Sequence, residues 1–249
     1  MATQKKIRNQ VERVNVDKEL QQNAVKNNIS SEADRIVVNY YTDPLCCWSW
    51  AFNKPWQQIQ ERFAPFLDVN YIMCGMIPSW DKFEDPMNCI SGPAQMGPLW
   101  MHIEQETKIS VASEIWLTDP PSSSLPACLA VKCATLQSSQ AGVGLFHRLQ
   151  QALMQKGLNI SKESVIHAVA SEYAEQHPSL FNFGHFELHW KKGAAKSLLR
   201  GDIQQALYYK IDRYPTLTLT HPKAEGLMMV GYRPYEVLQQ GFNSMFERI

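Results

Sequence analysis

Two adjacent cysteines and a nearby serine are the residues of this 249-residue chain whose types and spacing point most directly to chemistry. They lie in the segment DPLCCWSWAF, residues 43–52, after IVVNYY, a run of mostly β-branched and aromatic residues, and before a segment with helical periodicity. Redox-active cysteines commonly lie at the amino end of a helix in Cys-x-x-Cys motifs. Here Cys46 takes the first position, and Ser49 stands where the second cysteine belongs.

This position predicts that Cys46 is a nucleophile. The unpaired N–H groups and the positive dipole end at the start of a helix both favour a thiolate over a thiol. Ser49, three residues later, can hydrogen-bond that thiolate but cannot form a disulfide with it. We therefore expect a site that forms a mixed disulfide and does not resolve it by the usual intramolecular route.

The other cysteines offer alternatives for that resolving step. A disulfide between Cys46 and its neighbour Cys47 is possible but strained. Cys74 and Cys89 are further candidates that only their distance from Cys46 can decide. Free cysteines are most often small buried hydrophobic residues, and this is the interpretation we favour for three of them: Cys74, Cys128 and Cys133.

The elements around the motif form a recognisable unit. IVVNYY (36–41) is typical of a strand buried on both faces. Phe52, Trp56, Ile59 and Phe63 then recur at helical spacing, with Pro55 expected to kink the helix or to start it again. DVNYIMC (68–74) follows as a second strand. The sequence thus predicts a β-α-β unit with parallel, adjacent strands.

The remaining segments predict the rest of the fold. Residues from about 75 to 200 show helical spacing, strand patterns return at 214–221 and 226–232, and a last helix begins at Pro234 and buries Leu238, Phe242 and Phe246. The expected order is β-α-β, helical insertion, β-β-α. Residues 36–75 and 205–249 form one predicted domain and residues 76–204 the insertion, while residues 1–35 are a polar arm with a helix around 5–27.

This order and its motifs resemble the thioredoxin fold and, within it, the DsbA-like oxidoreductases, in particular the cytosolic FrnE-type branch with an Asp-Pro-x-Cys-Pro-Trp-Cys-Trp motif. The resemblance runs from about Ile36 to Phe246. It rests on DPLCCWSW, on CGM after the second strand, on LPACLAVKCA and LMQKGLNIS, and on YPTLTL ahead of GYRPYEVL.

The resemblance implies a role for individual residues. Cys46 matches the nucleophilic cysteine, Cys47 replaces the usual proline, and Ser49 replaces the resolving cysteine. Pro215 matches the cis-proline beside the active cysteine of this fold. The expected substrate-binding residues are Trp48, Met76, Tyr214 and Pro215.

The function that follows is thiol-disulfide exchange or isomerisation through one cysteine, with a thiol-containing protein, a peptide or glutathione as partner. No tightly bound cofactor is expected, and glutathione is the candidate co-substrate. Two alternatives stay open. The kappa-class glutathione transferases and 2-hydroxychromene-2-carboxylate isomerases resemble this architecture and hold glutathione with a serine, and some DsbA-like proteins are non-catalytic adaptors.

Composition narrows the partners further. Lys plus Arg equals Asp plus Glu, 24 against 24, so charge does not indicate nucleic acid or an anionic membrane surface. Neither a secretory signal nor a run of roughly 18 apolar residues is evident, which predicts a cytoplasmic protein. The seven histidines show no metal-ligand spacing, so no metal site is predicted.

Overall fold

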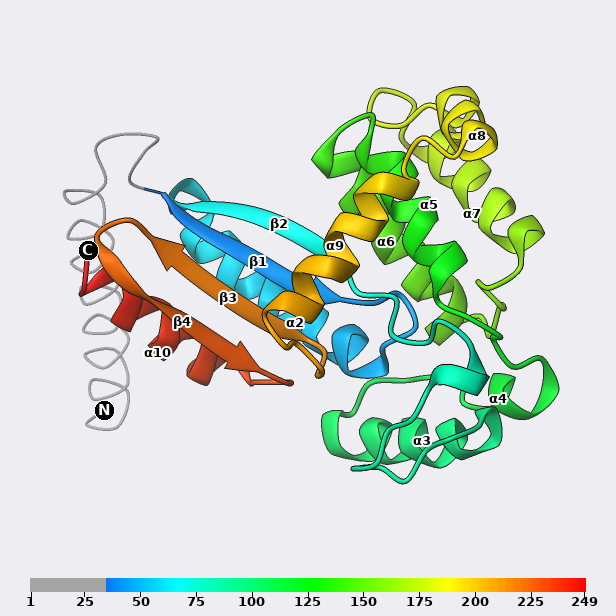
Figure 1. The fold of residues 1–249 in the computed structure, drawn as a ribbon, viewed down its shortest axis with the longest axis horizontal. Coiled ribbons are helices and arrows are strands. Elements are labelled where there is room, and N and C mark those ends of the chain that lie inside the picture. Colours follow the sequence, from blue (N-terminus) through cyan, green and yellow to red (C-terminus); the bar gives the residue numbers. More distant parts are fainter. Residues whose placement is uncertain (1–34) are drawn as a thin grey trace, which may run out of the picture.

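The structure is a computed structural model that describes residues 35–249. It is built on one four-stranded sheet with strand order β2-β1-β3-β4 (Figure 1). The strands are β1 (Ile36–Thr42), β2 (Leu67–Met73), β3 (Thr216–His221) and β4 (Ala224–Val230). Strands β1 and β2 are parallel neighbours, as the β-α-β pattern predicts, whereas β3 runs antiparallel to both β1 and β4. The predicted arm and its helix lie outside the described residues.

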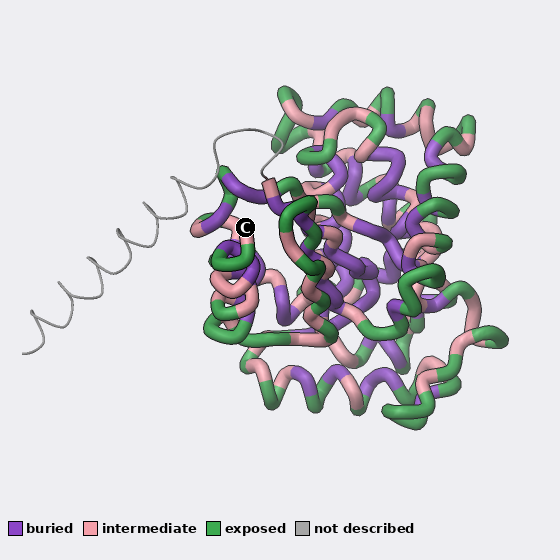
Figure 2. The backbone as a smooth tube through the Cα atoms, turned by 60° about the vertical axis from the view of Figure 1, so that its left-hand side comes forward, coloured by how far each residue is buried: buried purple, intermediate pink, exposed green. Residues whose placement is uncertain are grey.

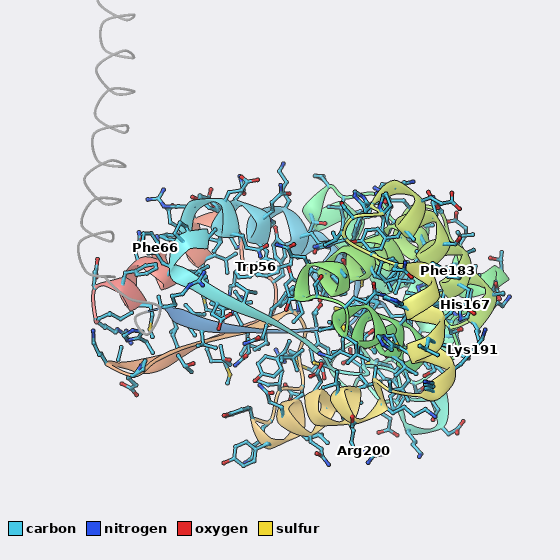
Figure 3. The ribbon with its side chains drawn as sticks, turned by 90° about the horizontal axis from the view of Figure 1, so that it is seen from above. Trp56, Phe66, His167, Phe183, Lys191 and Arg200 are labelled. Atoms are coloured by element: carbon cyan, nitrogen blue, oxygen red, sulfur yellow. The ribbon has the colours of Figure 1, made fainter. Side chains whose placement is uncertain are left out.

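Three helices lie against this sheet: α2 (Cys47–Phe63), α9 (Lys196–Tyr208) and α10 (Tyr235–Phe246). Helices α2 and α10 cover one face, and α9 lies on the opposite face (Figures 1 and 3). Helix α2 runs through Pro55 without a break. Of the two predicted effects of Pro55, a restart of the helix therefore does not occur. The last helix starts after Pro234 and buries Leu238 and Phe242, as expected.

The core between the sheet and helices α2 and α10 follows from alternation along β1 and helical spacing along α2. Even-numbered residues of β1 point toward α2, where the apolar side of α2 meets them. Figure 3 labels Trp56 and Phe66 in this layer. The main members are Ile36, Val38, Tyr40, Phe52, Trp56, Ile59, Phe63, Leu217, Leu219, Leu238 and Phe242.

A second core fills the helical block inserted after β2. This block contains α3 (Met96–Thr107), α4 (Ile115–Thr118), α5 (Leu125–Thr135), α6 (Ser139–Met154), α7 (Glu163–Gln176) and α8 (Phe183–Lys192). Figure 2 shows buried residues concentrated in the interior of the molecule and exposed residues at its surface. Within residues 35–249, no helix has the length and apolar character needed to cross a bilayer.

The helical block and the sheet are joined at their boundary by helix α9. This helix runs across the predicted domain boundary at 204/205, so that boundary cuts through a continuous helix. The rest of the predicted division into domains stays a prediction. The block's core also includes Leu45, Cys47 and Ala51 from the turn and first residues of α2, so the segment predicted to carry chemistry is packed between both parts.

A buried ion pair covers the free edge of β2. The Lys132 ammonium lies 2.8 Å from the Asp202 carboxylate, and both side chains are about one-tenth exposed. Asp202 also accepts a 2.8 Å hydrogen bond from the Met73 N–H, and Lys132 donates to the Tyr71 carbonyl at 3.5 Å. The pair therefore occupies main-chain groups that an edge strand would otherwise leave open.

We expect Lys132→Met to destabilise the fold by about 3–5 kcal/mol, because it leaves the Asp202 carboxylate buried without its cation. The matched control is Lys156→Met, which breaks the exposed Lys156–Glu172 pair, whose N–O distance is 3.8 Å, and should cost less than about 1 kcal/mol. Urea unfolding measures both. Equal losses in the two variants would contradict the assignment of a buried pair.

Candidate active site

The Cys46 sulfur lies at the amino end of α2, as the motif predicts. Cys46 is the N-cap residue, and its Sγ accepts a 3.4 Å hydrogen bond from the Ser49 N–H. The turn forms locally because the Cys46 N–H donates to the Asp43 carbonyl at 3.0 Å. The spacing from Cys46 to Ser49 thus places a backbone donor of the first helical turn directly on the sulfur.

The segment before β3 supplies the other side of the site. The Tyr214–Pro215 peptide bond is cis, as predicted. The Cys46 thiol donates to the Tyr214 carbonyl oxygen at 3.6 Å, across 168 residues of sequence. The structure therefore brings Cys46, Ser49 and Tyr214 together.

The two other predicted substrate-binding residues lie on the same turn or beside it. Trp48 is half-buried, and its ring centroid is 5.8 Å from that of Tyr232. Met76 is half-buried, and its N–H donates to the Asp43 carboxylate at 2.7 Å. Their roles in substrate binding stay predictions.

Burial outweighs the stabilisation of a Cys46 thiolate that is expected from the helix terminus. Cys46 is only 4% exposed, and burial raises its pKa from 9.0 to about 11. The Ser49 N–H, which donates to the sulfur, and the nearby Ser49 hydroxyl act in the opposite direction, while the Asp43 carboxylate adds to the increase. Desolvation of the sulfur outweighs the helix terminus, so Cys46 is a protonated thiol at neutral pH.

All six cysteines are free thiols. Cys47 is buried and belongs to the core of the helical block, and burial raises its pKa well above the usual value. Cys74, Cys128 and Cys133 are also buried, which fits the prediction of small core residues. Cys89 is exposed. Cys47, which packs into the helical block, is thus a protonated thiol at neutral pH.

Asp43 belongs to the site, although the Cys46 motif did not indicate it. Its carboxylate is completely buried and accepts hydrogen bonds from the Leu45 N–H at 2.9 Å and the Met76 N–H at 2.7 Å. The Cys128 thiol also donates to it at 3.3 Å. Burial raises the pKa of Asp43, and these hydrogen bonds lower it in part.

A sequence signal for Asp43 did exist. It is the one carboxylate in DPLCC, and it directly follows a predicted buried strand. Trp100 and Trp116 are buried core residues of the helical block, whereas Met87 is exposed. In the described part of the chain, no group of three or more His, Cys, Asp or Glu side chains could hold a metal ion.

A family model described as thioredoxin matches residues 40–240, which include the whole sheet except the start of β1, the Cys46 turn and the helical block. The chain belongs to this thioredoxin family. A ClpXP adapter protein SpxH from Halalkalibacterium halodurans is 27% identical over 207 residues, or 82% of this chain and 66% of the relative. The chain therefore spans slightly less than two thirds of that relative's length.

Solved structures show the same thioredoxin-like fold. A candidate protein disulfide isomerase from Nitrosomonas europaea has a TM-score of 0.70 and 19% identity, over 86% of this chain and 98% of that one. The cytosolic disulfide reductase DsbM from Pseudomonas aeruginosa has a TM-score of 0.63 and 15% identity, over 85% and 98%. A 2-hydroxychromene-2-carboxylate isomerase has a TM-score of 0.60 and 14% identity, over 84% and 95%. The expected thioredoxin fold with a helical insertion after the second strand is confirmed.

The raised pKa of Cys46 predicts a steep pH dependence of its alkylation. Because only the thiolate reacts, the rate with iodoacetamide should rise about tenfold per pH unit from about pH 7 to about pH 10. The exposed Cys89 should be modified before Cys46 at neutral pH. Peptide mass spectrometry of timed samples assigns each rate, and a plateau for Cys46 below about pH 9 would refute the buried, protonated thiol.

We also expect Asp43→Asn to lower the pKa of Cys46, because it removes a negative charge that disfavours the thiolate. The variant should also lose about 1–3 kcal/mol of stability, since an amide oxygen replaces only part of the carboxylate's hydrogen bonding. Asp68→Asn, at an exposed position of β2, is the control. An unchanged alkylation profile in a folded Asp43→Asn variant would contradict this electrostatic coupling.

Proposed function

We propose that this protein carries out single-thiol disulfide exchange through Cys46, with a cysteine-containing polypeptide or glutathione as partner. The observation that carries the proposal is the position of the Cys46 sulfur. It lies between the first turn of α2 and the Tyr214 carbonyl, 3.4 Å from the Ser49 N and 3.6 Å from the Tyr214 oxygen. The main chain at Tyr214 is suited to pair with an extended peptide held beside the sulfur.

The exchange has two steps. The Cys46 thiolate attacks a disulfide R–S–S–R′, forms a Cys46–S–S–R bond and releases R′–S⁻, which takes up a proton. A second thiolate, from glutathione or from the client's own cysteine, then attacks the R sulfur and releases the Cys46 thiolate. The electrons come from that second thiol, so the protein itself undergoes no net oxidation.

The surroundings of Cys46 support this one-thiol scheme. Ser49 occupies the position of a resolving cysteine and is completely buried beneath the sulfur. Cys47 belongs to the core of the helical block, and its thiol is protonated at neutral pH. Glutathione as co-substrate is also suggested by the solved complex of DsbM with GSH, which has a TM-score of 0.58 to this chain. A cytoplasmic location stays a prediction.

A second candidate function is that of an adapter, in which the fold presents a surface to another protein. The specific observation in its favour is the buried, protonated Cys46, which is a weak nucleophile at neutral pH. The relative from Halalkalibacterium halodurans is named as an adapter of ClpXP. The glutathione transferase or isomerase alternative has less support, because Ser49 is enclosed rather than open to a ligand.

The test of disulfide exchange is the reaction of the fully reduced protein with oxidised glutathione at about pH 8. We expect a glutathione adduct on Cys46, slower to form than the adduct on the exposed Cys89 because of the raised pKa of Cys46, and readily removed by reduced glutathione. Intact and peptide mass spectrometry give the stoichiometry and the site. Cys46→Ser should lose this adduct and Cys89→Ser should keep it. Absence of any Cys46 adduct would favour the adapter.

Ser49→Cys sharpens the test, since it supplies the resolving thiol that the native sequence lacks. The mixed disulfide at Cys46 should then convert to an intramolecular disulfide between Cys46 and the introduced thiol, so glutathione is released and no adduct accumulates. Ser49→Ala is the matched control, because it removes the hydroxyl without adding a thiol. If Ser49→Cys accumulates the same adduct as the native protein, the two positions are not arranged as a redox pair.

A further inference from the structure

Three buried hydroxyl groups lie behind the Cys46 sulfur: those of Tyr40, Thr42 and Ser49. All three residues are completely inaccessible to solvent. Tyr40 and Thr42 are two residues apart on β1, so their side chains point to the same face of the sheet, and Ser49 lies on the first turn of the helix that covers this face. The fold thus places three hydroxyls in one apolar layer.

These hydroxyls act on one another's pKa and on that of the Cys46 thiol. The Tyr40 hydroxyl has Thr42 and Ser49 as its side-chain neighbours. The Ser49 hydroxyl is in turn a neighbour of the Cys46 thiol. Yet within residues 35–249 none of the three hydroxyls makes a hydrogen bond of standard geometry. Buried hydroxyls without partners are rare, and such a group calls for an explanation.

The charge state of Cys46 provides one. In the structure the thiol is a donor, and it points to the Tyr214 carbonyl at 3.6 Å. A neutral thiol that donates to Tyr214 is stable without a hydrogen bond from the Ser49 hydroxyl. A thiolate is different, because it only accepts hydrogen bonds, and a buried one needs donors that take the place of water.

We propose that Tyr40 and Ser49 are positioning residues that form a buried hydroxyl chain, which orders when Cys46 ionises and stabilises its thiolate. The hydroxyl of Ser49 donates to the sulfur, that of Tyr40 donates to Ser49, and that of Thr42 donates to Tyr40. Each hydroxyl has one proton and two lone pairs, so all three links can form in this one direction. The inference rests on the proposed role of Cys46 as the nucleophile.

The buried hydroxyl chain explains how a deeply buried cysteine can still react. The hydrogen bonds reinforce one another when they point in the same direction, so Tyr40 acts on Cys46 through Ser49 without touching a substrate. It also gives a role to serine at the position of the resolving cysteine. A hydroxyl there is a donor to the thiolate that cannot be consumed by disulfide formation.

A purely structural role for Tyr40 is the competing explanation. Its ring packs against Phe52, Trp56 and Tyr71, at centroid distances of 5.6, 5.8 and 5.0 Å. Tyr40→Phe keeps this ring and removes only the hydroxyl, so it separates the two roles. Tyr71→Phe is the matched control, since it removes a hydroxyl from the same aromatic cluster. That hydroxyl accepts a hydrogen bond from the Trp56 N–H and is not part of the proposed hydroxyl chain.

The experiment measures the rate of Cys46 alkylation against pH in the full chain, with peptide mass spectrometry to follow Cys46 alone. We expect Ser49→Ala to slow alkylation about tenfold at a given pH and to shift the profile to higher pH. Tyr40→Phe should slow it roughly twofold with a shift in the same direction, and Tyr71→Phe should leave the profile unchanged. In the Ser49→Ala background, Tyr40→Phe should have no further effect.

The chain is overturned if Tyr40→Phe leaves the profile unchanged, if Tyr71→Phe shifts it equally, or if Tyr40→Phe still acts after Ser49→Ala. Circular dichroism checks that each variant folds. Should Tyr40→Phe not fold, the near-isosteric Thr42→Val tests the far end of the chain, with a smaller shift in the same direction expected and no shift refuting it. These rates need no disulfide partner, so a missing glutathione adduct refutes the proposed function without touching the hydroxyl chain.

Discussion

The hydrogen bonds to the buried Asp43 carboxylate are the interactions on which the rest of the site depends. It accepts the N–H of Leu45, next to the cysteine, and that of Met76, which follows β2. It also accepts the thiol of Cys128 on α5. One side chain therefore holds the end of β1, the start of α2 and the helical block in a single arrangement. A carboxylate is suited to this task because its two oxygens can accept several donors at once.

The packing that fixes the position of Cys46 also lowers the reactivity of its thiol. The turn is accurately placed because it is packed between the sheet and the helical block, but the same packing removes water from the Cys46 sulfur and raises its pKa. The helix terminus and Ser49 act against this increase without cancelling it. At neutral pH only a small fraction of Cys46 is therefore in the thiolate form that attacks disulfides.

The two candidate functions differ in whether the Cys46 sulfur forms a covalent bond with a partner. Membership of the thioredoxin family does not decide between them, because one fold carries both kinds of function. The difference lies in the few atoms around the sulfur, where Ser49 replaces a thiol.

The sequence by itself determined the main strands and helices and the central residues of the site. Period-two and period-3.6 patterns predicted β1, α2, β2 and α10 closely, and the resemblance placed Cys46, Ser49 and Pro215, because these signals are local. Only the tertiary structure decided the protonation of Cys46 and the part played by Asp43. Desolvation depends on segments far apart in the chain, as the contact between Asp43 and Cys128 across 85 residues shows, and no local pattern records it.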